Sequence, residues 1–476
     1  MPFRSKKYLY NKFCGVRAMH IKKITLRIAA MLSCGLLLGG RVSAWTESLY
    51  QLPSNTELSA KAAIVVNLGA NEQEDTVLFE LNAHSKRSPA ALVRFMVGLT
   101  AIEIIREKGL DIDKVTGKYT STQFNLITGS QLATVQMSYI NQEEWTIRDL
   151  LSISTIQTAA DACVTLATTL AGSNEEFVNK MNSLATEIGC KNTSFSNVTG
   201  LDSPNQYTTA ADLYKIIRYG MNYPEFEPLF SATQYTINPI KGGIPRSYGS
   251  TNDMMRRSTP YYYAPMAFGK TGFTDEAGRC LASVARDSGY EYLCVVLGAS
   301  DTDSQGERGV FYKETKTLYV WAFNNFTYET LLKKNEPIAT VKVNLAWNKD
   351  KVSLIPKESF STIAIKGLDL STIVKRPVGV PESIDAPVKK GQVLGKVQLI
   401  IQTDQVIGEV ELVASESIER SEVLDVWSKI LSFLTSPWFY VGLGLLLLLL
   451  IGYIILNIVH NRKRRRNRMK RINKYR

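Results

Sequence analysis

Twenty-two consecutive residues near the C-terminus, from Trp438 to Val459, carry no charge. As a helix rising 1.5 Å per residue, this run spans roughly 30 Å, the hydrocarbon thickness of a bilayer. Five basic residues follow directly at 462–466, and Lys/Arg-rich flanks stay in the cytoplasm. The sequence predicts a transmembrane helix over 438–459, a basic cytoplasmic tail over 460–476, and the rest of the chain outside.

The formal net charge of +12 is concentrated at the two ends of the chain. Residues 1–44 hold 9 Lys or Arg and residues 462–476 hold 10, and neither segment holds an acid. The residues between them carry 37 basic and 44 acidic side chains, a formal net of −7. The basic excess therefore flanks a membrane and indicates no nucleic-acid partner.

The N-terminus has the pattern of a secretory signal peptide over 1–44. Basic residues at 22–27 precede an apolar run at 28–38, and Val42-Ser43-Ala44 has the small residues of a cleavage site. Met19 is an alternative start to Met1. The other interpretation of this segment is an uncleaved anchor helix.

Four cysteines lie in the predicted exported part, and we expect all four to be free and buried. Cys280 and Cys294 flank a hairpin whose turn we place at 287–289, which pairs Arg286 with Tyr290. Cys280 then faces Val296, two residues out of register for a disulfide with Cys294. An exported chain could still pair its cysteines. The other two are Cys163 and Cys190. No cysteine or histidine cluster suggests a metal, and no cofactor is expected.

Hydrophobic residues in the first 325 residues recur either at every second position, as in strands, or at helical spacing. Two strands at 62–66 and 77–81 form a hairpin. A buried helix follows, capped by Ser88, with Pro89 in its first turn and its end at Lys108-Gly109. Further helices are expected to open at 144–151, 172–182 and 207–213, and a turn-rich loop at 192–202.

Beyond residue 330 the pattern changes to alternation, at 339–345, 396–399 and 407–413, which predicts a small β domain over 329–418. A linker over 419–437 contains a short amphipathic helix at 421–434, and Pro437 breaks it.

Lys270-Thr271-Gly272 lies near the start of the stretch Phe268 to Cys280, which we interpret as strand, turn and strand. With the motifs around it, the chain resembles the serine D-Ala-D-Ala carboxypeptidases, the low-molecular-mass penicillin-binding proteins, over about residues 60–325. The resemblance implies an α/β fold: a penicillin-binding-protein/β-lactamase-like domain over 45–328, with an antiparallel sheet flanked by helices. An all-β domain and one C-terminal transmembrane helix follow.

The family's reaction is acyl transfer, in which a serine attacks the D-Ala-D-Ala carbonyl. Its first motif, Ser-x-x-Lys, puts nucleophile and base one helical turn apart. The matching positions here hold Ala91, which has no nucleophile, and Arg94, which stays protonated and cannot act as a base. No other Ser-x-x-Lys occurs in the sequence.

The second motif, Ser-x-Asn, matches Thr158-Ala159-Ala160, so a hydroxyl remains at Thr158 and the amide is lost at Ala160. The third motif is intact. The resemblance implies that Lys270 and Thr271 meet the substrate carboxylate, and that Gly272 lets the ligand approach the strand. The alternative is that the strand serves folding alone. Arg94 either joins Lys270 in a positive cleft or forms a salt bridge to an acid.

His84 is the only histidine in the exported part, and we expect it to be solvated rather than part of a Ser-His-Asp triad. The sequence therefore predicts a catalytically inactive family member at the plasma membrane. It would bind peptidoglycan stem peptides or organise a cell-wall protein partner. Two alternatives remain open: an active carboxypeptidase with a rearranged site, and a purely structural anchor.

Overall fold

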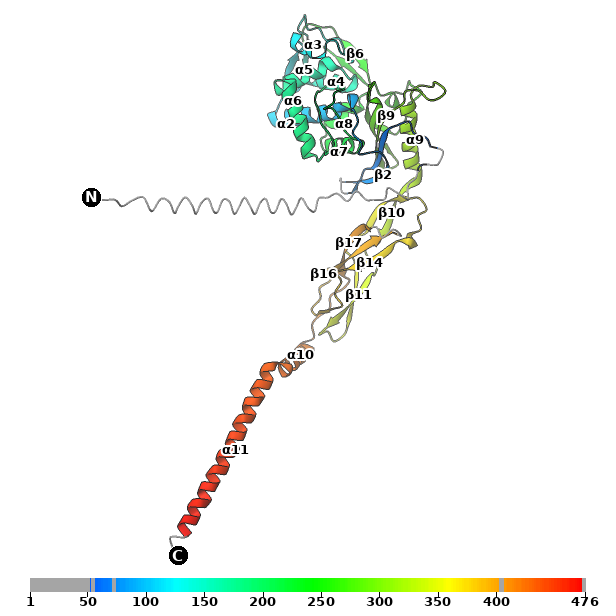
Figure 1. The fold of residues 1–476 in the computed structure, drawn as a ribbon. Coiled ribbons are helices and arrows are strands. Elements are labelled where there is room, and N and C mark those ends of the chain that lie inside the picture. The colour runs from blue at the N-terminus through cyan, green and yellow to red at the C-terminus, as the bar shows by residue number, and fades with distance from the viewer. Residues whose placement is uncertain (1–51, 53–55, 71–73, 402–405, 473–476) are drawn as a thin grey trace, which may run out of the picture. The chain divides into compact units, whose positions relative to one another are not determined.

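The computed structural model describes residues 52, 56–70, 74–401 and 406–472 (Figure 1). The predicted signal peptide over 1–44 lies outside the described residues. Two compact units divide the chain. The first reaches Tyr328 and takes in Ile363–Leu368, and the second comprises Glu329–Thr362 and the chain from Asp369 onward.

The first unit is built on a five-stranded antiparallel sheet in the order β2-β1-β9-β8-β7. Figure 1 shows β9 between a cluster of helices on one side and α9 on the other. The strands of this sheet are β1 (Ala62–Asn67), β2 (Thr76–Leu81), β7 (Met266–Thr274), β8 (Gly278–Asp287) and β9 (Tyr290–Ala299).

Helices and short strands make up the rest of the first unit. The α-helices are α2 (Arg94–Lys108), α3 (Ser121–Ile127), α4 (Ile147–Ile156), α5 (Ala160–Ala171), α6 (Asn174–Glu187), α7 (Ala210–Gly220), α8 (Phe226–Ser231) and α9 (Val310–Asn325). The shorter elements are η2 (Ala90–Val93), η3 (Asp253–Met255), β3 (Thr116–Lys118), β4 (Glu144–Thr146), β5 (Gln234–Ile237) and β6 (Arg246–Gly249).

One hydrophobic core joins the helices to the sheet. Its aromatic members include Phe95 on α2, Phe226 and Phe230 on α8, and Phe268 on β7. This packing fixes the start of α2 against β7, the two elements that carry the predicted site. The predicted fold class, an antiparallel sheet flanked by helices and followed by an all-β domain and one apolar helix, is confirmed.

The predicted register of the β8–β9 hairpin is wrong by one residue. Asp287 pairs with Tyr290, and the turn consists of Ser288 and Gly289, both with positive φ (50° and 84°). Two such residues match the twist of a two-residue hairpin turn. Cys294 consequently pairs with Ser283. All four cysteines of the predicted exported part are buried and free, as expected.

Two helix starts also differ from the sequence prediction. Glu144 to Thr146 form β4, which pairs with β3. Helix α4 therefore begins only at Ile147, and the Thr146 side chain caps it by accepting a hydrogen bond from the Asp149 amide. Ser88 does not cap the helix before α2, because its hydroxyl bonds the Asp202 carboxylate instead. The predicted end of α2 at Gly109 is correct.

The second unit contains a six-stranded sheet in the order β14-β16-β17-β12-β11-β15. Successive side chains of a strand point to opposite faces of the sheet, and buried and exposed residues accordingly alternate along much of β16. This explains the alternation of apolar and polar residues in the sequence. The elements of this unit are β11 (Ala339–Asn344), β12 (Lys351–Pro356), η4 (Leu370–Thr372), β14 (Val374–Val378), β15 (Ser383–Asp385), β16 (Val393–Ile400) and β17 (Val406–Ala414). A two-stranded sheet of β10 (Phe326–Leu332) and β13 (Phe360–Ile365) has residues in both units.

Two helices end the described chain. The predicted amphipathic helix is α10 (Glu422–Thr435), with exposed apolar residues such as Trp427 and Leu431. Pro437 opens α11 (Pro437–Ile472), which is longer than the predicted 438–459 because the helix continues through the basic tail, and Lys and Arg are good helix formers. In the described chain, one helix is long and apolar enough to cross a membrane, over Pro437–Arg465.

Candidate functional site

Strand β7, which carries Lys270-Thr271-Gly272, lies at the edge of the five-stranded sheet and pairs there with β8. Its Gly272 packs tightly against the start of the α2 segment. A Cβ on Gly272 would lie 2.9 Å from the Ala91 nitrogen and 3.2 Å from the Ala90 Cβ. The close approach at Gly272 is therefore to the protein's own backbone.

Lys270 is almost fully buried, with 2% of its surface exposed. Its ammonium donates to Thr158 Oγ1 at 2.6 Å, to Thr251 Oγ1 at 3.1 Å and to the Thr271 carbonyl at 3.0 Å. Burial, and then the charge of Arg94, lower the pKa of Lys270 to about 7. Near neutral pH this amine exists in both protonation states.

Two threonine hydroxyls bond the Lys270 ammonium, and the Thr271 hydroxyl joins this network through Thr251. A charged ammonium only donates, so Thr158 and Thr251 accept from it and their own hydrogens point elsewhere. Thr251 Oγ1 also lies 3.0 Å from Thr271 Oγ1. All three threonines are partly exposed, so the network offers hydroxyl donors to a ligand. The sequence did not single out Thr251, because no motif marks it.

Arg94, at the family's base position, is completely buried at the first residue of α2. Its guanidinium donates to three backbone carbonyls: Ser154 at 3.0 Å, Thr158 at 3.4 Å, and Val198. Burial lowers the pKa of Arg94, but an arginine remains protonated under physiological conditions. Arg94 forms no ion pair with any described carboxylate, so the predicted alternative of a salt bridge is wrong. The charge of Arg94 reaches Lys270, but its side chain has no exposed surface for a ligand.

Ala91, at the family's nucleophile position, lies in the 3-10 turn η2 directly before α2 and is 8% exposed. The preceding residue, Ala90, has φ 44°, a conformation that costs free energy for a residue with a Cβ. The turn therefore presents position 91 next to Gly272, but the side chain there is a methyl group.

The second motif lies between α4 and α5. Thr158 has φ 63°, which is strained for a β-branched residue, and this places its hydroxyl on Lys270 and its carbonyl near Arg94. Ala160 is fully buried, and its amide donates to the Ala133 carbonyl. Asp161 then accepts hydrogen bonds from the Val135 and Met137 amides, which fixes the neighbouring loop.

The structure thus brings together most of the predicted site residues. Thr158 contacts both Arg94 and Lys270, and Gly272 contacts the turn at Ala91. His84 is separate: its side chain is 68% exposed, and its one close carboxylate is that of Glu80, 3.8 Å away. Among the described residues no group of His, Cys, Asp or Glu could hold a metal ion.

Family models match both units of this chain. A model described as D-alanyl-D-alanine carboxypeptidase matches residues 50–301, and a model of the C-terminal domain of penicillin-binding protein 5 matches residues 326–420. DacF of Bacillus subtilis, named a D-alanyl-D-alanine carboxypeptidase, is 29% identical over 401 residues, which are 83% of this chain and 95% of the relative. DacC of Escherichia coli, with the same enzyme name, is 28% identical over 405 residues, covering 83% of this chain and 92% of DacC.

Solved structures share the fold. The D-alanyl-D-alanine carboxypeptidase DacD from Francisella tularensis aligns with a TM-score of 0.60 at 21% identity, over 79% of this chain and 97% of that chain. Penicillin-binding protein 5 from Haemophilus influenzae aligns with a TM-score of 0.56 at 24% identity, over 78% of this chain and 100% of that chain.

Proposed function

Because the chain belongs to the D-alanyl-D-alanine carboxypeptidase family, we propose that it is a non-catalytic member that binds peptidoglycan stem peptides ending in D-Ala-D-Ala. The observation that carries this proposal is the pair of residues at the start of α2. Ala91 has no nucleophilic atom, and Arg94 gives all its described hydrogen bonds to backbone carbonyls. Loss of a catalytic serine alone removes several orders of magnitude in rate.

Features of the third motif support retained peptide binding. Edge strand β7 can take a peptide as an added strand. Beside it, the hydroxyls of Thr158 and Thr251 accept from the Lys270 ammonium, and the Thr271 hydroxyl lies 3.0 Å from that of Thr251. Hydroxyl donors backed by a buried cation suit a terminal carboxylate. In this proposal Lys270 acts through the hydroxyls, and Thr271 touches the ligand.

The proposal includes a location. A signal peptide over 1–44 would direct export, and the apolar helix over 438–459 would then hold residues 45–437 on the outer face of the plasma membrane, with the basic tail in the cytoplasm. In this arrangement the carboxypeptidase-like domain, 45–328, faces the cell wall and any cell-wall protein partner.

One observation favours a second candidate, an active hydrolase with a rearranged site. Thr158 Oγ1 lies 2.6 Å from Lys270 Nζ, and the pKa of that lysine is lowered to about 7. A neutral lysine could take the hydroxyl proton while Thr158 Oγ1 attacks the peptide carbonyl carbon between the two D-Ala residues. The C–N bond would then break, the lysine ammonium would give the proton to the leaving amine of the terminal D-Ala, and the acyl group would be held as an ester on Thr158. Attack of water on this ester would release the shortened peptide and restore the Thr158 hydroxyl.

Penicillin labelling of the full-length protein in detergent, read by intact mass, tests the two candidates. We expect no covalent adduct. An adduct that disappears in Thr158→Val would support the rearranged hydrolase and refute the inactive one. Binding is tested next, by titration with a peptide ending in D-Ala-D-Ala and a matched peptide ending in L-Ala-L-Ala. Binding of the D-form alone, lost in Thr271→Val, supports the proposal. Binding of neither peptide would leave a purely structural anchor.

A further inference from the structure

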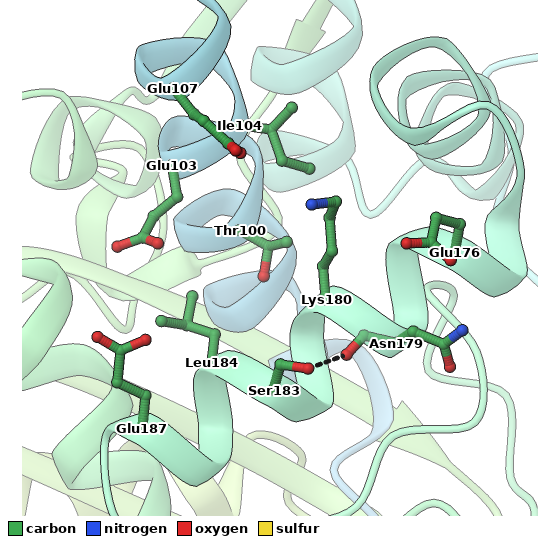
Figure 2. A pocket seen from close by; sticks show the side chains of 10 residues that line it. All are labelled: Thr100, Glu103, Ile104, Glu107, Glu176, Asn179, Lys180, Ser183, Leu184 and Glu187. Atoms are coloured by element: carbon green, nitrogen blue, oxygen red, sulfur yellow. Dashed lines mark hydrogen bonds between the residues drawn. The ribbon is translucent and has the colours of Figure 1, made fainter. Parts of the chain in front are cut away.

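The first unit has a pocket of about 450 Å³ between α2 and α6, lined by four glutamates and Lys180 among others (Figure 2). Its acidic wall identifies no ligand, because Thr100, Ile104 and Leu184 are at most 5% exposed and a molecule in the groove would not reach them. A more specific surface lies in the second unit, where the chain approaches its apolar helix.

Helix α10 has an apolar face that the protein does not cover, since none of its residues is buried. The opposite face is polar, and Asp425 and Lys429 form an ion pair there. A helix of this pattern lies in the plane of a membrane surface with its apolar side inward. The apolar residues recur at helical spacing and are all at least 41% exposed: Val423, Trp427, Ile430, Leu431 and Leu434.

A short corner joins α10 to the predicted span. Ser436 alone separates α10 from α11, and the Phe433 ring packs edge-on against the Phe439 ring, with centroids 5.5 Å apart. The last turn of α10 is therefore held where the uncharged run begins. An upright α10 would carry its first residue about 20 Å above the bilayer and leave its apolar face in water, so the flat orientation is favoured.

The loop between β11 and β12 is tied to the first turn of α10. The Ser421 amide, directly before α10, donates to the Leu345 carbonyl at 2.8 Å, and Lys349 forms an ion pair with Glu416. Trp347 lies between these two anchors and is 70% exposed. Two residues of extended chain span at most about 7 Å, so the Trp347 backbone lies within about 10 Å of Ser421. A flat α10 therefore brings this indole to the membrane surface.

Tryptophan is enriched at membrane–water interfaces, where its apolar ring is buried and its N–H stays hydrated. We propose that the β11–β12 loop is a further membrane contact, which places the Trp347 ring in the headgroup region of the outer leaflet. The proposal rests on the location proposed above. With α10 and the span, this contact holds the second unit at a fixed tilt and stops it from rotating about Ser436.

Burial of the ring, rather than lipid charge, provides the contact. Lys349 and Arg420, the cations beside the two anchors, are each paired with an acid of the same chain. The contact should therefore form on zwitterionic lipid and persist at high salt, unlike attraction to an anionic surface.

Tryptophan quenching by brominated lipid tests this contact in the full-length protein, reconstituted into phosphatidylcholine vesicles. The chain has six tryptophans, so the emission of Trp347 is taken as the difference between the wild type and Trp347→Phe, which keeps an aromatic ring in the loop. We expect this difference emission to be lost with lipids brominated near the top of the acyl chains, at low and at high salt.

Two control variants separate the loop contact from the proposed location. Trp438→Phe gives the emission of a tryptophan at the start of the span by the same difference. Trp347→Phe with Glu358→Trp moves the tryptophan to the exposed turn after β12, about 20 Å from the loop at the rise of a strand. Emission from this turn should not be quenched.

The outcomes distinguish the two proposals. Quenching of Trp438 without quenching of Trp347 would overturn the loop contact and leave the location intact. Absence of quenching at both positions would refute the location and the loop contact with it. Equal quenching at positions 347 and 358 would also overturn the loop contact, because it would indicate adsorption of the whole unit to the vesicles.

Discussion

The buried amine of Lys270 predicts a specific pH dependence of folding. Its pKa is lowered from 10.5 to about 7, first by burial and then by Arg94, whereas in the unfolded chain it returns to about 10.4. Between these values the unfolded chain binds more protons than the folded one, so stability rises with pH. Below pH 7 both states are protonated, and the folded protein bears the full cost of the buried charge.

The magnitude follows from the shift. About 3.5 pKa units at 1.36 kcal/mol each correspond to about 5 kcal/mol for the fully charged lysine, and about 2 kcal/mol of this is recovered between pH 7 and pH 9. Lys270→Met keeps a long side chain in the same space and removes the charge. The wild type should therefore gain about 2 kcal/mol relative to this variant over that pH range.

Denaturant unfolding of both proteins at pH 7, 8 and 9, followed by fluorescence of tryptophans such as buried Trp145, measures the difference. Other groups that titrate in this range are present in both proteins and cancel. Lys114→Met, at an exposed lysine paired with Asp111, is the control and should show no such gain. If the wild type and Lys270→Met keep a constant difference in free energy from pH 7 to 9, the reasoning about Lys270 is refuted.

Further predictions concern the same site. Ala91→Ser alone should stay unlabelled by penicillin because Arg94 cannot accept its proton, whereas Ala91→Ser with Arg94→Lys should label slowly; labelling of the single variant would show that Arg94 is not the block. Gly272→Ala should lower the unfolding free energy by about 1–3 kcal/mol, since its Cβ would lie 2.9 Å from a backbone nitrogen, while Gly249→Ala, with no atom closer than 3.6 Å, should cost less than about 1 kcal/mol in the same denaturation assay. Binding of a D-Ala-D-Ala peptide should weaken from pH 6 to pH 9 as Lys270 loses its proton, and a pH-independent affinity in the same titration would exclude a role for its charge.

Local patterns were enough to predict the main elements of the fold. The alternation at 62–66 and 77–81 corresponds to the β1–β2 hairpin, and Gly109 ends α2 with φ 60°. These features depend on neighbouring residues, which the sequence displays directly. Elements that depend on distant partners were missed: Glu144–Thr146 is a strand because it pairs with Thr116–Lys118.

The residues of the candidate site were predictable from motifs, but their contacts were not. Thr251 lies beside Lys270 although 19 residues separate them in the chain. The Ser88 hydroxyl donates a hydrogen bond to the Asp202 carboxylate, although the two residues are 114 positions apart in the chain. For Arg94, the sequence predicted either a positive cleft shared with Lys270 or a salt bridge to an acid. The observed acceptors are backbone carbonyls, which every residue carries and no sequence pattern marks.

These carbonyls give Arg94 a structural role that bears on the proposed loss of catalysis. Its guanidinium joins the end of α4, the turn at Thr158 and the loop at Val198 to the first residue of α2. A lysine at this position has a shorter reach and a single nitrogen, so Arg94→Lys would leave at least one buried carbonyl without a donor, at about 1–3 kcal/mol. Regaining a base at position 94 therefore costs stability before a nucleophile at position 91 can bring any benefit. We therefore expect Ala91→Ser and Arg94→Lys each to yield no activity when introduced alone, so that in the proposed non-catalytic protein neither substitution by itself would be favoured.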